Sequence, residues 1–170
     1  MAVETTPARH SAAELPGRPC SIATALSIVG ERWALLAIRE ISLGNRRFGT
    51  IAAGTGAPRD ILTARLRALE SAGILYRTQY SEHPPRFEYR LTTAGRDLQP
   101  VLTALRLWGD RWLAEEPPVV FEHECGTPIT VSTRCPRCEV DIDHTTVTPH
   151  ANDPHWHRNN PAWPGPDPSH

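Results

Sequence analysis

The stretch SEHPPRFEYRLT, residues 81–92, constrains the fold more than any other part of the chain. In its second half apolar and charged side chains alternate, with Phe87, Tyr89 and Leu91 on one side, which predicts a strand with one face in water. Because proline cannot donate a hydrogen bond to a strand ladder, the proline pair before this strand must lie in a loop. The preceding segment ILYRTQY also has strand character, so the two segments are predicted to form a hairpin around that loop.

Two segments with helical patterns precede the hairpin. The segment RRFGTIAAGTG can supply only a short helix before its glycines interrupt it, whereas APRDILTARLRALESAG predicts a longer helix that ends at Gly73. Pro58 suits the first turn of the longer helix, whose apolar stripe consists of Leu62, Leu66 and Leu69. A short helix, a glycine-containing turn and a longer helix with a polar front form a helix-turn-helix, and the hairpin that follows is then its wing.

Helices are also predicted on both sides of this arrangement. Upstream, the segments CSIATALSIVG and ERWALLAIREISLG are apolar at helical spacing and end at Gly30 and Gly44. Downstream, a final helix is predicted to run to about Ala114, with an apolar stripe of Leu98, Val101, Leu102, Leu105, Trp108 and Trp112. This stripe could close the domain's own core, but its length and its aromatic content favour a homodimer interface.

Composition divides the chain into a basic part and an acidic part. Residues 18–112 contain 14 arginines and 8 acidic residues, whereas residues 113–170 contain 3 arginines and 9 acidic residues. The basic surplus is compatible with a polyanion partner, although an ordinary solvated surface can have the same composition. No apolar run is long enough to span a membrane and the N-terminus has no apolar signal segment, so we expect a cytoplasmic protein.

The polar front of the longer helix carries the residues best suited to contact DNA. Four of them lie within about one face, the arrangement that presents side chains to base edges: Arg59, Asp60, Thr63 and Arg67. Contacts to the phosphate backbone are predicted for Arg46 and Arg47, which open the short helix, and for Arg86 after the wing prolines. Arg65 falls nearer the apolar stripe and is expected to form an internal ion pair. A merely solvated helix face is the alternative, but the wing favours DNA.

Several blocks in this order resemble one known family. They are GERWALLAIREISLGNRRF, LTARLRALESAGIL, PPRFEYRLTTAGRDL and WGDRW, with Cys20 at the start of the first helix. Over roughly residues 18–113 the chain resembles the HxlR-type winged helix-turn-helix transcriptional regulators. The resemblance implies a homodimer, with its N-terminal and C-terminal helices at the interface, that binds an inverted-repeat operator in double-stranded DNA. It also implies control by a small-molecule effector or an oxidant, and repression is the commoner mode of action in the family.

Cys20 has the position of the redox-active cysteine in the sensors of this family. Family members often have Cys-Pro there, whereas this chain has Pro19-Cys20-Ser21. A helix N-terminus and the nearby Arg18 both stabilise negative charge on sulfur, which makes Cys20 a redox-sensing candidate. The alternative is an inert buried thiol, which is the usual state of a lone cysteine.

The acidic part of the chain contains the segment HECGTPITVSTRCPRCE. Cys135 and Cys138 form a C-x-x-C knuckle with His123 and Cys125 upstream, so three thiolates and an imidazole could close a tetrahedral structural zinc site. The intervening PITVSTR has strand character, as a zinc ribbon requires. The spacing of His123 and Cys125 is tighter than usual, and His144 is an alternative fourth ligand. A redox pair of Cys135 and Cys138, or no site at all, are the other interpretations.

These patterns predict an α+β fold with four parts. Residues 1–17 form a flexible arm, residues 18–114 a winged helix-turn-helix with a long C-terminal dimerisation helix, residues 115–148 a small zinc-ribbon-like appendage, and residues 149–170 a disordered tail rich in proline and histidine. No nucleophile–base set, P-loop or dinucleotide fingerprint is present, so we do not expect an enzyme. The rival interpretation is a winged helix that binds another protein, with the ribbon as its docking surface.

Overall fold

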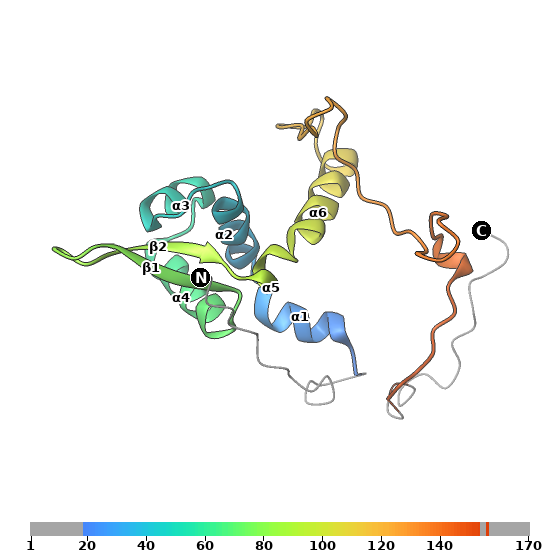
Figure 1. The fold of residues 1–170 in the computed structure, drawn as a ribbon, viewed down its shortest axis with the longest axis horizontal. Coiled ribbons are helices and arrows are strands. Elements are labelled where there is room, and N and C mark those ends of the chain that lie inside the picture. The colour runs from blue at the N-terminus through green and yellow to red at the C-terminus, as the bar shows by residue number, and fades with distance from the viewer. Residues whose placement is uncertain (1–18, 154–155, 157–170) are drawn as a thin grey trace. The chain divides into compact units, whose positions relative to one another are not determined.

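A computed structural model describes residues 19–153 and residue 156. The predicted arm, Arg18 and most of the predicted tail lie outside the described residues. The chain divides into two compact units (Figure 1). In the described chain, the first unit is Ser21–Leu102, and the second contains residues 19–20 together with the chain from Thr103 onward.

The first unit contains the predicted helix-turn-helix and wing. In chain order its elements are α1 (Ser21–Val29), α2 (Arg32–Ser42), α3 (Phe48–Thr55), α4 (Arg59–Ser71), β1 (Leu75–Ser81), β2 (Arg86–Leu91) and α5 (Thr93–Arg96). Helix α2 packs against both α3 and α4, and α4 packs against β1. Gly44 and Gly73 follow the ends of α2 and α4 with φ values of 93° and 69°, so the predicted glycine stops are confirmed.

The core of this unit lies between α2 and α4. On α4 the predicted stripe is confirmed, since Leu62, Leu66 and Leu69 are all fully buried. They pack with Ile38 of α2 and Ile51 of α3 in one cluster. Full burial of a leucine side chain contributes about 1.5–3 kcal/mol, so the stripe determines which face of α4 points outward.

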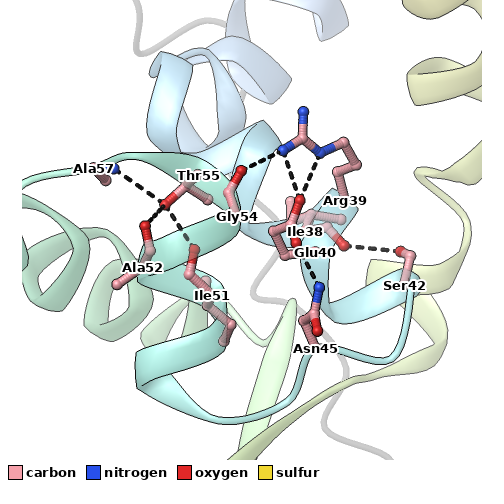
Figure 2. Close-up of polar contacts among 10 residues, drawn as sticks. All are labelled: Ile38, Arg39, Glu40, Ser42, Asn45, Ile51, Ala52, Gly54, Thr55 and Ala57. Carbon is pink, nitrogen blue, oxygen red and sulfur yellow. Dashed lines mark hydrogen bonds and ion pairs between the residues drawn. The ribbon is translucent and has the colours of Figure 1, made fainter. Parts of the chain in front are cut away.

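One charged side chain lies inside this apolar region. Glu40 of α2 is only 4% exposed. Its carboxylate accepts hydrogen bonds from the Arg39 guanidinium, at 2.6 and 2.9 Å, and from the Asn45 side-chain amide, at 2.6 Å. Arg39 also donates to the Gly54 carbonyl of α3 at 2.9 Å (Figure 2). A Cβ atom on Gly54 would lie 2.1 Å from a Glu40 carboxylate oxygen, so any larger residue there would displace that carboxylate.

The antiparallel hairpin of β1 and β2 projects beyond the helices (Figure 1). Its loop contains the proline pair, Pro84 and Pro85, as predicted. The predicted alternation holds only near the core, where Leu91 is buried, whereas Phe87, predicted on the buried face, is 41% exposed. The far half of the hairpin has no core beneath it, and the Phe87 ring centroid lies 5.3 Å from the guanidinium carbon of Arg77 instead.

The predicted final helix is present and begins just after Leu98, the first residue of its predicted stripe. The short helix α5 is followed by a separate helix, α6, which extends over Gln99–Trp112. Thr92 caps α5, because its side-chain hydroxyl accepts a hydrogen bond from the Gly95 amide at 3.2 Å. The predicted final helix is therefore confirmed as α6, whereas the short helix α5 was not predicted. Leu98 falls in the break, where it packs against the core of the first unit.

The second unit contains α6 from Thr103 onward and the segment that follows it. Residues 113–153 contain one 3-10 turn, η2 (His144–Thr146), and two isolated bridges, Glu122 to Pro128 and Arg134 to Asp141. The predicted strand PITVSTR is not formed. Within the described residues no single helix is long and apolar enough to cross a membrane. Only α1 and α2 taken together have that length and apolar character, and they are bent by 76° at the break between them.

We predict that Glu40→Ala lowers the free energy of unfolding by about 2 kcal/mol, because it removes the acceptor for Arg39 and leaves the Asn45 amide without its partner. Chemical denaturation followed by circular dichroism measures the change. The matched control is Glu82→Ala in the exposed wing loop, which should alter stability by less than about 0.5 kcal/mol. Equal stability of Glu40→Ala and the parent protein would contradict the role given to this network.

Candidate nucleic-acid interface

Local hydrogen bonds fix the turn between α3 and α4. Gly56 follows α3 in the left-handed conformation, with a φ of 69°. The Thr55 hydroxyl donates to the Ile51 carbonyl at 2.8 Å and accepts from the Ala57 amide at 3.2 Å (Figure 2). Pro58 was predicted in the first turn of α4, but it lies just before the helix, at the N-cap position. These bonds determine the direction in which α4 leaves the turn.

The face of α4 opposite its leucine stripe is open to solvent. Arg59, Asp60 and Arg67 are exposed and Thr63 is half-buried, so the four predicted base-reading residues are brought together on one face. The Thr63 hydroxyl donates to the Arg59 carbonyl at 2.7 Å. The guanidinium carbon of Arg59 lies 4.9 Å from the centroid of the Phe48 ring. Stacking on this ring orients Arg59 without neutralising its charge.

Arg46 and Arg47 lie just before α3 and connect it to the wing. The Arg46 carbonyl accepts a hydrogen bond from the Tyr89 amide of β2 at 2.7 Å, and Arg47 forms an isolated bridge with Glu88. The Arg47 guanidinium carbon lies 4.7 Å from the centroid of the Tyr80 ring. Tyr80 was not predicted as part of the interface, because a tyrosine in a predicted strand is ordinarily expected to pack against the sheet.

Two further arginines differ in their surroundings. Arg86 is exposed at the first residue of β2 and lies opposite Ser81 in the projecting part of the hairpin. Arg65 lies 4.0 Å from the Glu31 carboxylate, and its Nε atom is buried without a hydrogen-bond partner among the described residues. The expected ion pair of Arg65 is therefore present but weak, since Glu31 is mostly solvated.

The predicted interface residues within α6 are largely uncovered. Val101, Leu105, Trp108 and Trp112 are 47%, 51%, 56% and 63% exposed. The helix has no buried residue at all. Large apolar side chains that are exposed together at helical spacing indicate a surface that binds another apolar surface.

Cys20 lies immediately before α1 and is half-buried. It is a reduced cysteine and belongs to the same compact unit as α6 from Thr103 onward. Its predicted electrostatic partner, Arg18, lies outside the described residues. The redox role of Cys20 stays a prediction.

The predicted metal ligands form two pairs at two tight turns. In each pair the ligand atoms are 3.2 Å apart: Nδ1 of His123 with Sγ of Cys125, and Sγ of Cys135 with Sγ of Cys138. A residue with positive φ follows each pair, Gly126 at 79° and Glu139 at 56°. Among the described residues, no group of three or more His, Cys, Asp or Glu side chains is arranged to hold a metal ion. The pairs are thus formed, but the four ligands are not gathered.

Hydrogen bonds at these turns alter the acidity of the thiols. Bonds with Thr127 and His123 lower the pKa of Cys125 to about 7. The backbone amide and the thiol of Cys138 lower the pKa of Cys135, while the bond with Cys135 raises the pKa of Cys138. A lowered pKa favours the thiolate, which is the form of cysteine that binds metal ions and reacts.

A short helix, a left-handed glycine turn, an exposed arginine-bearing helix and a projecting hairpin together define a winged helix-turn-helix DNA-binding protein. The sequence profile of the family described as HxlR-like helix-turn-helix matches residues 28–117. The chain belongs to this family, as its sequence blocks predicted.

Relatives of the chain are similar over most of its length. An uncharacterized HTH-type transcriptional regulator of Mycobacterium bovis is 45% identical over 132 residues, which cover 76% of this chain and 84% of the relative. Another from Synechocystis is 43% identical and covers 59% of this chain and 75% of the relative. The crystal structure of PA1607, a candidate transcription factor, matches with a TM-score of 0.70 and 31% identity, covering 79% of this chain and 95% of that one. The protein is a DNA-binding transcriptional regulator of the helix-turn-helix type.

Proposed function

We propose that the protein is a homodimeric repressor that binds an inverted-repeat operator. The observation that carries this proposal is the exposed polar face of α4, which the buried leucine stripe directs outward beside the projecting hairpin. Such a helix fits the major groove, and a two-fold dimer matches a pseudo-palindromic site. Expression of a reporter from the protein's own upstream DNA should rise when the protein is removed, and a fall would indicate an activator.

The polar residues divide into two roles in the proposed complex. Direct contact with base edges is assigned to the exposed face of α4: Arg59, Asp60, Thr63 and Arg67. Arginine can bridge the two acceptors of guanine, and threonine can contact a thymine methyl group. Contact with phosphates, which supplies affinity but no sequence information, is assigned to the arginines beside the short helix and on the wing: Arg46, Arg47 and Arg86.

The exposed apolar face of α6 is the observation that supports the proposed homodimer. A helix of 14 residues is only marginally stable in water by itself, because most helical stability in proteins comes from packing of an apolar face. Trp108 and Trp112 are more than half exposed, and tryptophan is enriched where proteins associate. A second copy of the same helix supplies a partner, since a two-fold interface is self-complementary.

Cys20 is proposed as a redox switch that acts on this dimer. The Cys20 thiolate attacks one oxygen of hydrogen peroxide, the O–O bond breaks, hydroxide leaves, and the sulfur becomes a sulfenic acid. Cys20 directly precedes α1 and shares a compact unit with most of α6. A polar oxygen added there would shift these helices, and with them the spacing of the two α4 helices in the dimer.

A structural zinc ion is proposed for the second unit. The apolar residues after α6 lie at the surface, among them Phe121, Ile129 and Val140, so this segment has no core of its own. Each turn already holds two ligand atoms 3.2 Å apart, close to the edge of about 3.7 Å that tetrahedral zinc–sulfur bonds of about 2.3 Å require. Metal binding would draw the two turns together and contribute the folding free energy that the segment lacks.

For DNA binding, we predict that Arg59→Ala weakens operator binding by about 1–3 kcal/mol and random-DNA binding by less, since base contacts carry discrimination. Arg86→Ala should weaken both by similar factors and reduce the slope of log affinity against log salt by about one. Fluorescence anisotropy at several salt concentrations measures both effects. The control Arg137→Ala, in the second unit, should match the parent. A protein without affinity for its own upstream DNA would favour the rival protein-interaction module.

For the dimer, we predict that Trp108→Glu raises the dissociation constant at least about 30-fold, which corresponds to about 2 kcal/mol, because a charge would replace an aromatic anchor of the proposed interface. Light scattering coupled to size-exclusion chromatography at several concentrations measures the change. The control is Val119→Glu, an equally exposed apolar residue after α6. Identical masses for the parent and Trp108→Glu at every concentration would exclude α6 as the interface.

For Cys20, we predict that peroxide lowers the operator affinity of the parent roughly tenfold, within the usual range of coupling between sites. The variant Cys20→Ser should not respond. Anisotropy before and after treatment, followed by thiol reduction, provides the measurement. Equal responses of the parent and Cys20→Ser would remove the switch.

For the metal, we predict about one zinc ion per chain in reduced protein, with a strong loss in Cys135→Ser and in His123→Ala. His144→Ala and Cys20→Ser are the matched controls and should retain zinc. Elemental analysis gives the stoichiometry, and limited proteolysis after chelation should cut the second unit while the first survives. If His123→Ala retains zinc and His144→Ala loses it, His144 is the fourth ligand instead of His123. Parent protein that contains no zinc would exclude the site.

A further inference from the structure

A hollow of about 330 Å³ opens on the first unit where six of its segments meet. Arg46 comes from the turn before α3, Arg90 from β2 and Arg96 from α5, and all three line the hollow. The wall is completed by polar groups such as Ser42 and Tyr76 and by apolar side chains. The turn before α3 and the adjacent elements β2 and α5 thus bring three guanidinium groups to one depression.

The charge of the lining is positive and mostly uncompensated. No acidic residue lines the hollow. Arg90 donates through Nε to Glu88 at 2.8 Å, so one of the three charges has a carboxylate partner. Arg96 donates to neutral oxygens, the Leu91 carbonyl at 3.0 Å and the Thr93 hydroxyl at 3.1 Å. Arg46 forms no side-chain hydrogen bond or ion pair within the described chain. Such a site favours an anion.

The volume of the hollow and its apolar lining indicate which kind of anion fits. Ile41 and Leu91 are almost fully buried and present hydrocarbon at the hollow. A volume of about 330 Å³ is at the small end of ligand sites, which suits a compound of about one ring. We propose that the hollow binds a small organic carboxylate, with the carboxylate on the guanidinium groups and the hydrocarbon part against Ile41 and Leu91.

This proposal rests on the proposed repressor function for its regulatory consequence. Arg46 directly precedes the helix-turn-helix, Arg90 lies on the wing, and Gln99, which also lines the hollow, begins α6. A carboxylate held by several of these residues would fix the wing and the helix-turn-helix relative to the start of the dimerisation helix. The ligand would then alter operator affinity, and by linkage the operator would alter ligand affinity by the same factor.

The binding test uses the full reduced chain without DNA and benzoate as the probe. Isothermal titration should detect benzoate, while its uncharged isostere benzamide and inorganic phosphate should bind at least roughly tenfold more weakly. Arg46→Gln and Arg90→Gln should each weaken benzoate roughly tenfold, as expected for a lost charge-assisted hydrogen bond. The matched control Arg67→Gln, an exposed arginine away from the hollow, should retain benzoate affinity.

Three results would overturn the proposal. They are no heat of binding at about 10 mM benzoate, where even a millimolar site would be filled, equal affinity for phosphate, and unchanged affinity in Arg46→Gln and Arg90→Gln. If these variants lose affinity for all DNA sequences and the parent binds no benzoate, the arginines contact phosphate and the hollow is no effector site. Operator binding of the parent without benzoate is measured separately, so failure of the repressor function and failure of the carboxylate site remain distinguishable.

Discussion

The buried carboxylate of Glu40 determines how the central helix α2 and the helix-turn-helix fit together. A buried charge is costly unless it is paired, and its partners here come from its neighbour Arg39 and from Asn45 in the turn after α2. Arg39 also donates to the Gly54 carbonyl of α3, so the same ion pair connects α2 to α3. The turn at Gly56 connects α3 to α4, so this contact also helps to position α4.

The helix-turn-helix and the wing were predictable because their signals are local. Helical spacing of the leucines, a glycine after the helix and a proline pair before a strand each act within a few residues. Glu40 was not singled out, because a glutamate in a helix is ordinarily solvated. One signal was available: Glu40 follows Ala37 by three residues and precedes Ile41, so it lies near the apolar side of α2.

The short helix α5 before α6 was missed for a different reason. Its residues, Thr93–Arg96, carry no apolar stripe, so periodicity does not predict it. Pro100 marks the first turn of α6, where a missing amide hydrogen costs nothing, and it was the local signal for a new helix. The break also depends on packing, since a Cβ atom on Gly95 would lie 2.2 Å from the Ile74 carbonyl oxygen. That approach cannot be inferred from the sequence.

The residues of the candidate site were likewise predictable only where they lie on one element. The base-reading face of α4 follows from helical spacing, whereas the stacking of Arg47 on Tyr80 and the meeting of Arg46, Arg90 and Arg96 require the folded chain. Only the assembled unit shows that an arginine assigned to phosphate also lines a hollow. Sequence spacing can therefore identify a contact surface on one element but not a pocket between several.

The two compact units differ in what they need in order to be stable. The first has a buried core of its own, which includes Ile38, Leu62 and Leu66, whereas the second leaves the tryptophans of α6 and the valines of the following turns exposed. Exposed apolar surface of this extent is stabilised when another surface covers it. The proposed second copy would cover α6, and the proposed zinc ion would stabilise the turns that follow it. Because a half-operator contact is weak alone, operator affinity then depends on the contacts of α6. In this proposal, a ligand at the start of that helix, or an oxidant at Cys20, would control DNA binding without contacting DNA.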